Sequence, residues 1–202
     1  MHQTSYNKMN DFVQQYLNKK MPLSILDLGS QNVNGCYRPL FEHPGWTYLG
    51  VDLEPGPNVD LILADPYDWK DIGSHTMDVV ISGQAFEHIK YFWVTMLEIS
   101  RVLKTGGLCC IIAPSAGYEH RYPVDCWRFY ADGFTALAEY AFLDPLKAYT
   151  QKQDNGVEGE LWKDTVLVAE KKPLSIRDTV RFRMKNFFLK RFLYQCKEKT
   201  YG

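Results

Sequence analysis

The residues best suited to chemistry lie in one run between positions 115 and 130. The run holds a histidine, a carboxylate, a guanidinium and two aromatic rings, at His120, Asp125, Arg128, Tyr122 and Trp127. Because an imidazole has an ordinary pKa of about 6.5, His120 is the first candidate for a general base, and Asp125 can orient its ring. Arg128 can hold a carboxylate or phosphate with its planar fork, and the two aromatic rings can form an apolar wall. The run therefore indicates a pocket for a small molecule that loses a proton.

A second group of polar residues follows apolar runs that are typical of buried strands. Asp27, Asp52 and Asp65 each stand at or near the end of such a run. We expect strands over residues 24–28, 46–52, 60–65, 77–82 and 108–113, a last pair near 146–150 and 165–169, and helices over 5–17, over 91–103 and from 131 onward. This alternation predicts an α/β fold with a doubly wound, mostly parallel, seven-stranded sheet. Ligands bind beyond the carboxyl ends of such strands, so the three carboxylates should face one crevice.

The turn after the first expected strand indicates that this crevice binds a nucleoside. Gly29 permits a tight turn whose backbone N–H groups approach a ligand closely, and its loop leads toward an expected helix. Asp52 lies about 20 residues further on, where a carboxylate can accept hydrogen bonds from both ribose hydroxyls, and Asp65 can reach an adenine amino group. Three carboxylates would repel a pyrophosphate, so we expect a ligand that is neutral or positively charged.

Five segments in this order resemble the class I S-adenosylmethionine-dependent methyltransferases, most of all their small-molecule branch. They are residues 26–29 (Leu-Asp-Leu-Gly), 50–52 (Gly-Val-Asp), 64–65 (Ala-Asp), 78–82 with 86–89 (Asp-Val-Val-Ile-Ser and Phe-Glu-His-Ile) and 101–107 (Arg-Val-Leu-Lys-Thr-Gly-Gly). The resemblance covers about residues 20–170. It implies the Rossmann-like fold of that family, with S-adenosylmethionine as the methyl donor and S-adenosylhomocysteine as the product.

The resemblance also implies which residues contact the methyl donor. Gly29 and its loop would hold the methionine part, Asp52 the ribose and Asp65 the adenine. Ser82 and Gln84 would line the methyl-donor face. The full expected set is Asp27, Gly29, Ser30, Gln31, Gly35, Asp52, Leu53, Asp65, Pro66, Ser82 and Gln84.

One departure from the family pattern concerns the loop after Gly29. The family has glycines at alternate positions there, but Gln31 and Val33 stand at the second and third of these positions. The next glycine is Gly35. We therefore expect a wider loop than in the family.

Two histidines compete for the role of general base. His88, within Glu-His-Ile, is the runner-up to His120, and each has a structural role as its alternative. Arg128 equally fits an ion pair with Asp125 that only holds the loop. His120 and Asp125 offer two metal ligands without a clear third, so we expect no metal. The run 120–129 resembles runs in bacterial methyltransferases of uncharacterised or sugar-related context.

These features predict an enzyme that transfers a methyl group from S-adenosylmethionine to a small molecule. A hydroxyl of a sugar, a glycan precursor or a natural product is the leading acceptor. The driving force lies in the sulfonium donor, so the protein mainly aligns the reactants. Two alternatives stay open: a non-catalytic S-adenosylmethionine-binding module, and a nucleic-acid methyltransferase that docks through a basic tail.

The overall composition fits one globular domain. Of 202 residues, 46% are apolar, and no run approaches the roughly 20 apolar residues that span a bilayer. The polar start has no secretory signal, and the five cysteines show no paired C-x-x-C spacing. We therefore expect a cytoplasmic protein with reduced thiols.

The net charge of −1 hides an uneven distribution. Residues 171–202 carry ten basic and two acidic side chains, a charge of +8, and residues 1–170 carry 13 basic and 22 acidic side chains, a charge of −9. We expect a methyltransferase domain over 1–170 and a basic amphipathic helical extension over 171–202. The segment 173–199 has three candidate uses: packing on the domain or on a second subunit, peripheral contact with an anionic inner-membrane surface, and, least favoured, nucleic-acid binding.

Overall fold

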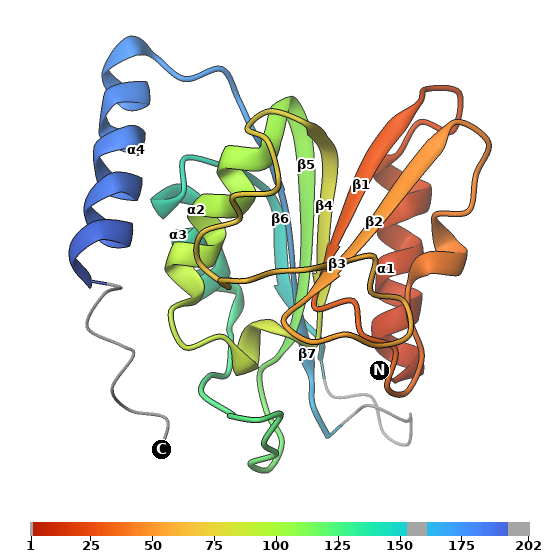
Figure 1. The fold of residues 1–202 in the computed structure, drawn as a ribbon. Coiled ribbons are helices and arrows are strands. Elements are labelled where there is room, and N and C mark those ends of the chain that lie inside the picture. Colours follow the sequence, from red (N-terminus) through yellow and green to blue (C-terminus); the bar gives the residue numbers. More distant parts are fainter. Residues whose placement is uncertain (1, 153–160, 194–202) are drawn as a thin grey trace.

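A computed structural model describes residues 2–152 and 161–193, which form a seven-stranded sheet with helices on both faces (Figure 1). The strands are β1 (Leu23–Leu28), β2 (Trp46–Asp52), β3 (Leu61–Ile62), β4 (Met77–Gly83), β5 (Leu103–Pro114), β6 (Asp144–Thr150) and β7 (Asp164–Glu170). The helices are α1 (Gln3–Tyr16), α2 (Phe92–Val102), α3 (Ala131–Tyr140) and α4 (Ile176–Phe188), with 3-10 turns at Arg38–Leu40 and Phe86–His88 and a π-helical turn at Leu189–Leu193. The last part of the helical extension expected over 171–202 lies outside the described residues.

The strand order confirms the doubly wound, mostly parallel sheet that the sequence predicts. It is β3-β2-β1-β4-β5-β7-β6, with β7 antiparallel to both of its neighbours. β1 pairs in parallel with β2 on one side and with β4 on the other, so the strand order reverses there. The carboxyl ends of these three strands meet at one edge of the sheet, the lower edge in Figure 1. This edge is where a ligand site is expected.

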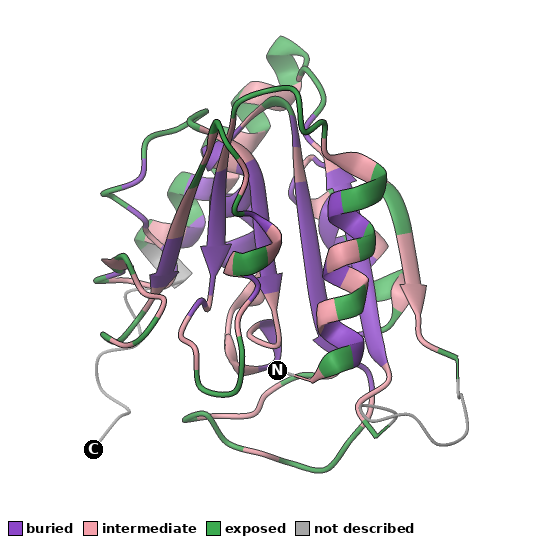
Figure 2. Cartoon of the chain, turned by 90° about the vertical axis from the view of Figure 1, so that its right-hand side faces the viewer, coloured by how far each residue is buried: buried purple, intermediate pink, exposed green. Residues whose placement is uncertain are grey.

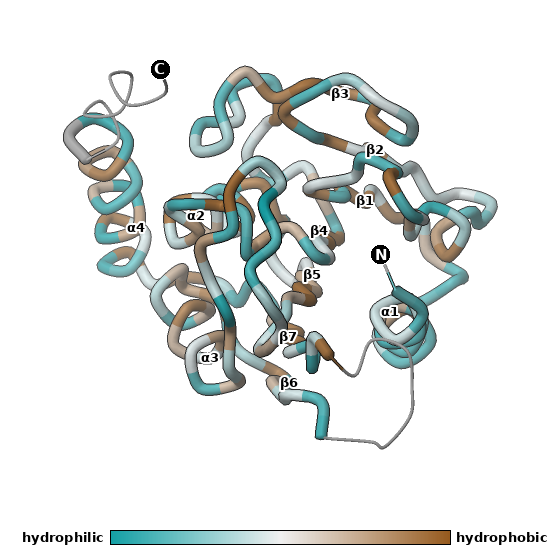
Figure 3. The backbone as a smooth tube through the Cα atoms, turned by 90° about the horizontal axis from the view of Figure 1, so that it is seen from below, coloured by the Kyte–Doolittle hydropathy of each residue, from teal (hydrophilic) through white to brown (hydrophobic). Residues whose placement is uncertain are grey.

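Two helical layers bury the two faces of the sheet. Alternate residues of a strand point to opposite faces, so Val80 packs in the cluster under α2 and α3 while Val79 and Ile81 pack in the cluster under α1. Seen from below, α1 lies on one side of the sheet, α2 and α3 lie on the other, and α4 lies outside them (Figure 3). Figure 2 shows the central strands buried and the outer sides of the helices exposed. Because the helices cover both faces of the sheet, a functional site is expected at the edges of the sheet or at the loops that follow the strands.

β3 is shorter than the strand expected over residues 60–65. It keeps only Leu61–Ile62, because the chain turns at Asp65. The Asp65 side chain accepts a hydrogen bond from the backbone N–H of Tyr67 at 2.8 Å, an Asx turn that Pro66 favours. The turn places Asp65 on a loop beyond the strand.

The loop after β1 does not lead into an α-helix as the sequence predicted. Between β1 and β2 the chain forms only the 3-10 turn Arg38–Leu40. Gly35, Pro39, Pro44 and Gly45 interrupt this segment too often for a longer helix. α1, which the sequence predicted within two residues of its observed ends, packs beside this turn and covers the same face of the sheet.

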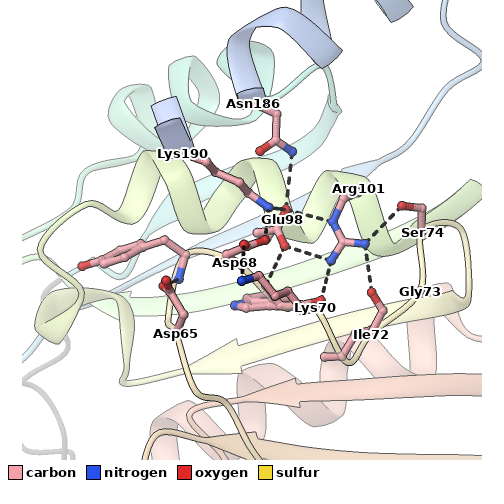
Figure 4. A network of polar contacts seen from close by, with 12 residues as sticks. Asp65, Asp68, Lys70, Ile72, Gly73, Ser74, Glu98, Arg101, Asn186 and Lys190 are labelled. Carbon is pink, nitrogen blue, oxygen red and sulfur yellow. Dashed lines mark hydrogen bonds and ion pairs between the residues drawn. The ribbon is translucent and has the colours of Figure 1, made fainter. Parts of the chain in front are cut away.

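A buried carboxylate joins α4 to α2 (Figure 4). Glu98 is fully buried and accepts hydrogen bonds from Arg101 at 2.8 and 2.9 Å and from the backbone N–H of Trp69 at 2.9 Å. From the tail, Lys190 Nζ lies 2.8 Å from Glu98 and Asn186 donates to it at 3.4 Å. Burial alone would raise the pKa of Glu98, but the hydrogen bonds from Arg101 and Lys190 outweigh it and hold the pKa below its ordinary value. The carboxylate is therefore ionised and fixes α4 against the body.

Replacing this carboxylate should destabilise the fold. Glu98→Gln keeps the shape but leaves Arg101 and Lys190 without their shared negative charge, so we expect the free energy of unfolding at pH 7 to fall by about 3 kcal/mol. Urea denaturation measures this. Because the folded-state pKa is depressed, the carboxylate stabilises the fold above its unfolded pKa, and this contribution is lost as the pH falls through the folded pKa.

Glu139→Gln, at an exposed carboxylate on α3, is the matched control and should change the unfolding free energy by less than about 0.5 kcal/mol. A Glu98→Gln protein as stable as the control would contradict the structural role of the network.

Candidate active site

The turn after β1 depends on a glycine. Gly29 has a φ of +75°, and its N–H donates a hydrogen bond to the carbonyl of Val51 at 2.9 Å. A Cβ atom at this position would lie 2.5 Å from the Cβ of Ala85, in the loop after β4. Only glycine avoids both the strained φ and this clash. The turn therefore brings the end of β1 directly against the loop after β4.

Asp52 closes the same edge from the end of β2. Its carboxylate accepts hydrogen bonds from the backbone N–H of Gln31 at 3.0 Å and of Leu53 at 2.7 Å. The structure thus brings together Asp52 and the loop after Gly29, which the sequence placed on one crevice. A carboxylate has about four lone-pair positions, so two stay available to the hydroxyls of a ribose.

Asp27 lies beneath this edge instead of lining it. Its side chain is buried, and the hydroxyl of Tyr48 donates a hydrogen bond to it. Burial raises the pKa of Asp27 to about 7, although the Tyr48 hydrogen bond acts in the opposite direction. Asp27 therefore lies below the ends of β1 and β2, and its carboxyl group is partly protonated at neutral pH.

Ser82 and Gln84, expected to line the methyl-donor face, are engaged elsewhere. The Ser82 hydroxyl is fully buried and donates to the carbonyl of Leu28 at 2.9 Å, which ties β4 to β1. The Gln84 amide donates to Ser5 at 3.2 Å and to Asp164 at 3.0 Å, toward α1 and β7. Both residues therefore position the strand ends through hydrogen bonds within the protein.

The remaining residues of the expected donor set lie on the loops of this edge. Ser30 is buried, and its hydroxyl donates to a backbone carbonyl of the loop before β3 at 3.1 Å. Gly35 is exposed, with a φ of +109°, in the loop after β1. Leu53 is exposed, and Asp65 and Pro66 are half-buried on the loop after β3. These loops surround the ends of β1, β2 and β3, as the sequence predicts.

Three groups that bind protons or metals meet beyond the end of β4. Glu87 and His88 lie on the 3-10 turn after β4, and His120 lies on the loop after β5. One ligand atom from each lies within 4.8 Å of the other two. The rings of His88 and His120 meet edge to face with their centroids 5.0 Å apart. We call Glu87, His88 and His120 the carboxylate–histidine cluster.

Glu87 is the member of this cluster that the sequence analysis missed. Its side chain is fully buried, and neither carboxylate oxygen has a hydrogen-bond partner among the residues that the structure describes. Burial raises the pKa of Glu87 to about 8. The available signal was its position beside His88 just after the fourth strand, but nothing in that position indicates that the side chain points inward.

An ion pair holds the loop that carries His120. Arg128 donates to both carboxylate oxygens of Asp125, at 2.6 and 2.8 Å, and this hydrogen bonding holds the pKa of Asp125 well below its ordinary value. Asp125 also accepts from the backbone N–H of His120 at 2.7 Å, and its Oδ2 lies 3.4 Å from the His120 ring nitrogen Nδ1. Asp125 therefore fixes the backbone of His120 and lies near its ring, and Arg128 forms the ion pair that is the alternative to substrate binding. Burial lowers the pKa of His88, although the carbonyl of Val124 acts in the opposite direction.

Aromatic side chains border the cluster. Trp127 packs against Phe92 of α2 with ring centroids 5.2 Å apart, and its indole N–H donates to the carbonyl of Lys90 at 3.2 Å. Tyr122 is 60% exposed, and its ring centroid lies 6.4 Å from that of His88. The predicted wall is therefore present, with Trp127 anchored and Tyr122 open to solvent.

Comparisons with known proteins agree with this geometry. Residues 26–111 match a family model described as a methyltransferase domain. They run from β1 into β5 and include Gly29, Asp52 and two members of the carboxylate–histidine cluster. The chain therefore carries a methyltransferase domain over these residues. Two solved structures of the same fold hold S-adenosylhomocysteine or S-adenosylmethionine.

Solved structures share the fold of this methyltransferase at low sequence identity. A chain in the complex of the Haloferax volcanii Trm112 methyltransferase activator with a methyltransferase has a TM-score of 0.63 and 15% identity, over 83% of this chain and 90% of that one. The Burkholderia thailandensis 1,6-didemethyltoxoflavin-N1-methyltransferase was solved with bound 1,6-didemethyltoxoflavin and S-adenosylhomocysteine. It has a TM-score of 0.60 and 14% identity, over 84% of this chain and 85% of that one. A Bacillus halodurans methyltransferase has a TM-score of 0.61 and 12% identity, over 84% and 100%.

No curated protein matches the sequence of this methyltransferase. The loop 115–130 lies beyond the residues that match the family model. The match therefore covers the strand ends around Gly29 and Asp52 and leaves out the loop 115–130, which carries His120.

We expect Asp52 to contribute to donor binding through its two unused lone-pair positions. Asp52→Ala should weaken S-adenosylmethionine binding about 10- to 100-fold, because hydrogen bonds to a charged group contribute about 1.5–3 kcal/mol. Isothermal titration calorimetry measures the affinity. Glu54→Gln, at an exposed carboxylate of the same loop, should bind as the parent protein does. Equal affinities for the Asp52→Ala and Glu54→Gln proteins would refute the contact.

Proposed function

We propose that this methyltransferase acts on a hydroxyl group of a small molecule, of the kind found in sugars, glycan precursors and natural products. The carboxylate–histidine cluster is the observation that carries the proposal. Ala85 touches the donor turn at Gly29, and Glu87 follows two residues later, so the cluster lies beside the donor site. An alcohol must lose a proton as it is methylated, and groups that accept protons are suited to that step.

The reaction is a direct displacement at the methyl carbon of the donor. The oxygen–carbon bond forms as the carbon–sulfur bond of the sulfonium breaks, and the hydroxyl proton leaves the acceptor. Asp125 holds His120 by its backbone, and the ring of His120 is partly open to solvent. His120 is therefore placed to take this proton, with His88 next to it, while Trp127 and Tyr122 would hold the carbon skeleton of the acceptor.

Two other functions make different demands on the site. A non-catalytic S-adenosylmethionine-binding module has no use for unpartnered proton acceptors beside the donor turn, and such groups favour an enzyme. A nucleic-acid methyltransferase would use the basic helix α4, which begins at the upper edge of the sheet in Figure 1, opposite the loop 115–130. The placement of the cluster therefore favours a small acceptor.

The proposal is tested on turnover. With a panel of hydroxylated sugars and phenols as acceptors, His120→Ala should lower the rate of S-adenosylhomocysteine formation by roughly 10²–10⁴-fold. Its affinity for S-adenosylmethionine should equal that of the parent protein, since the donor turn is untouched. Glu119→Gln, one residue away at an exposed carboxylate, is the control and should keep its activity.

Full activity of His120→Ala would remove His120 from the acceptor site. Methylation of amines with no methylation of hydroxyls by the parent protein would overturn the proposed acceptor.

We also infer that α4 contacts an anionic membrane surface. Its inner side packs through Phe182, Asn186 and Leu189 on the body. A second apolar stripe faces outward and is half to nearly fully exposed, at Ile176, Val180, Met184, Phe187 and Phe188. Within residues 2–152 and 161–193 no helix is long and apolar enough to cross a bilayer. An exposed apolar stripe along one side of a basic helix is typical of helices that lie on a membrane surface.

The charge near α4 is complementary to anionic headgroups. Arg177 and Arg181 follow the stripe along the helix. A cavity of about 580 Å³ between α4 and the amino ends of β4 and β5 is lined by six basic side chains, those of His75, Arg101, Lys171, Lys172, Arg183 and Lys190, of which Arg101 and Lys190 also pair with Glu98. Cations beside an apolar stripe are typical of interfacial helices.

Met184→Glu should weaken binding to vesicles of phosphatidylcholine and phosphatidylserine about tenfold, because it places a charge in the apolar stripe. Co-sedimentation measures this, with the same substitution at exposed Met21, before β1, as the control. A parent protein that does not bind these vesicles would refute the membrane contact. Dimerisation that Met184→Glu abolishes would assign the apolar stripe to a second copy of the chain. Salt-sensitive DNA binding without vesicle binding would assign the basic side chains to nucleic acid.

A further inference from the structure

The carboxylate–histidine cluster has the composition of a metal site. The geometry points to a binding site for a divalent transition-metal cation, formed by a carboxylate oxygen of Glu87, Nε2 of His88 and a ring nitrogen of His120. The three ligand atoms already lie within 4.8 Å of one another. A modest contraction around an ion at the usual 2.0–2.2 Å ligand distances would close the site.

Glu87 is the first argument for an ion. Its side chain is fully buried, and within residues 2–152 and 161–193 neither oxygen has a hydrogen-bond partner, whereas buried carboxylates in proteins are almost always paired, hydrogen-bonded or bound to metal. The two terminal nitrogens of the nearby Arg128 guanidinium donate to Asp125 and to the carbonyls of Tyr118 and Trp127, whereas its Nε has no hydrogen-bond partner among the described residues. A cation at the cluster would supply the missing partner of Glu87.

His88 is oriented as a metal ligand. Its Nδ1 lies 2.5 Å from the backbone carbonyl of Val124, so Nδ1 carries the proton and donates it to that carbonyl. The lone pair is then on Nε2, which lies 3.7 Å from Oε1 of Glu87. A carbonyl or carboxylate on the far nitrogen is the usual support of a metal-binding histidine, because it fixes the tautomer and the ring orientation.

His120 completes the set from a different element. Asp125 holds its backbone, and Trp162 packs on its ring with centroids 4.5 Å apart. Its Nδ1 is buried without a hydrogen bond, although a carboxylate oxygen lies 3.4 Å away. The His120 side chain is 32% exposed, so the cluster is reached from the side of the loop 115–130.

Two imidazoles and one carboxylate favour borderline ions such as Zn²⁺, Co²⁺, Ni²⁺ or Fe²⁺ over Mg²⁺ or Ca²⁺, which prefer oxygen ligands. Three protein ligands leave at least one coordination position open. The use of that position rests on the proposed function: the acceptor hydroxyl binds there, its pKa falls, and its proton passes to water as the oxygen–carbon bond forms and the carbon–sulfur bond breaks. His120 then acts on the acceptor through the ion, in place of taking the proton itself.

The test is direct metal binding to the full chain, without an acceptor. After dialysis against EDTA and removal of the chelator, Co²⁺ and Zn²⁺ are titrated by calorimetry, and Co²⁺ also by visible absorption. We expect one site per chain, with visible d–d bands and without the intense near-ultraviolet band of thiolate ligation. Glu87→Gln and His88→Ala should each weaken binding at least 100-fold, and Glu119→Gln, outside the cluster, should bind as the parent protein does.

Folding of the variants is checked by circular dichroism and by S-adenosylmethionine affinity, which Glu87→Gln should preserve. Zn²⁺ should raise the Tm of the parent protein and of Glu119→Gln, but not of Glu87→Gln. A parent protein that binds Co²⁺ no more tightly than Glu87→Gln would overturn the metal site. Hydroxyl methylation that proceeds at the full rate in EDTA would leave the proposed function standing and overturn the role of the ion. Metal binding without hydroxyl methylation would leave the metal site standing and overturn the proposed function.

Discussion

The close approach of two strand-end loops at Gly29 is the constraint on which the site depends. Because Gly29 lacks a side chain, Ala85 can lie where a Cβ would clash at 2.5 Å, and β1 and β4 can end side by side. Ser82 strengthens this junction by donating to the carbonyl of Leu28. The donor turn and the residues that follow Ala85 are therefore placed together by backbone packing, before any side chain contacts a ligand.

The acceptor loop is docked on the same junction. The backbone carbonyl of Glu87 accepts hydrogen bonds from the N–H groups of Cys126 at 2.8 Å and Trp127 at 3.2 Å. The loop is then held by Asp125, which binds the Arg128 side chain and the His120 backbone at once. One residue, Glu87, thus anchors the loop by its main chain and turns its carboxylate inward. The position of that carboxylate follows from the docking. Because its oxygens have no hydrogen-bond partner among the described residues, the cluster can take up a proton or a cation.

The sequence predicted what depends on local pattern and failed where long-range packing decides. Apolar runs bounded by polar residues located the strands. The spacing from Gly29 to Asp52 predicted that the loop after Gly29 lies beside Asp52, and the backbone N–H of Gln31 in that loop donates to Asp52 at 3.0 Å. The hydroxyl of Ser82 could not be placed, because its orientation depends on a neighbouring strand 54 residues away. The hydrogen-bond partners of Gln84 could not be foreseen for the same reason, since they come from α1 and β7.

The distribution of charge has a physical consequence that the totals conceal. Lys190, from the basic tail, lies 2.7 Å from Asp68 and 2.8 Å from Glu98, so part of the opposite charge of tail and body is neutralised at one contact. Glu98 would be costly to bury without that cation and Arg101, because an unpaired buried carboxylate is strongly destabilising. The inner side of the tail helix is therefore fixed by these polar contacts together with the packing of Phe182 and Leu189. This attachment leaves the second apolar stripe, with Ile176, Val180 and Met184, exposed to solvent.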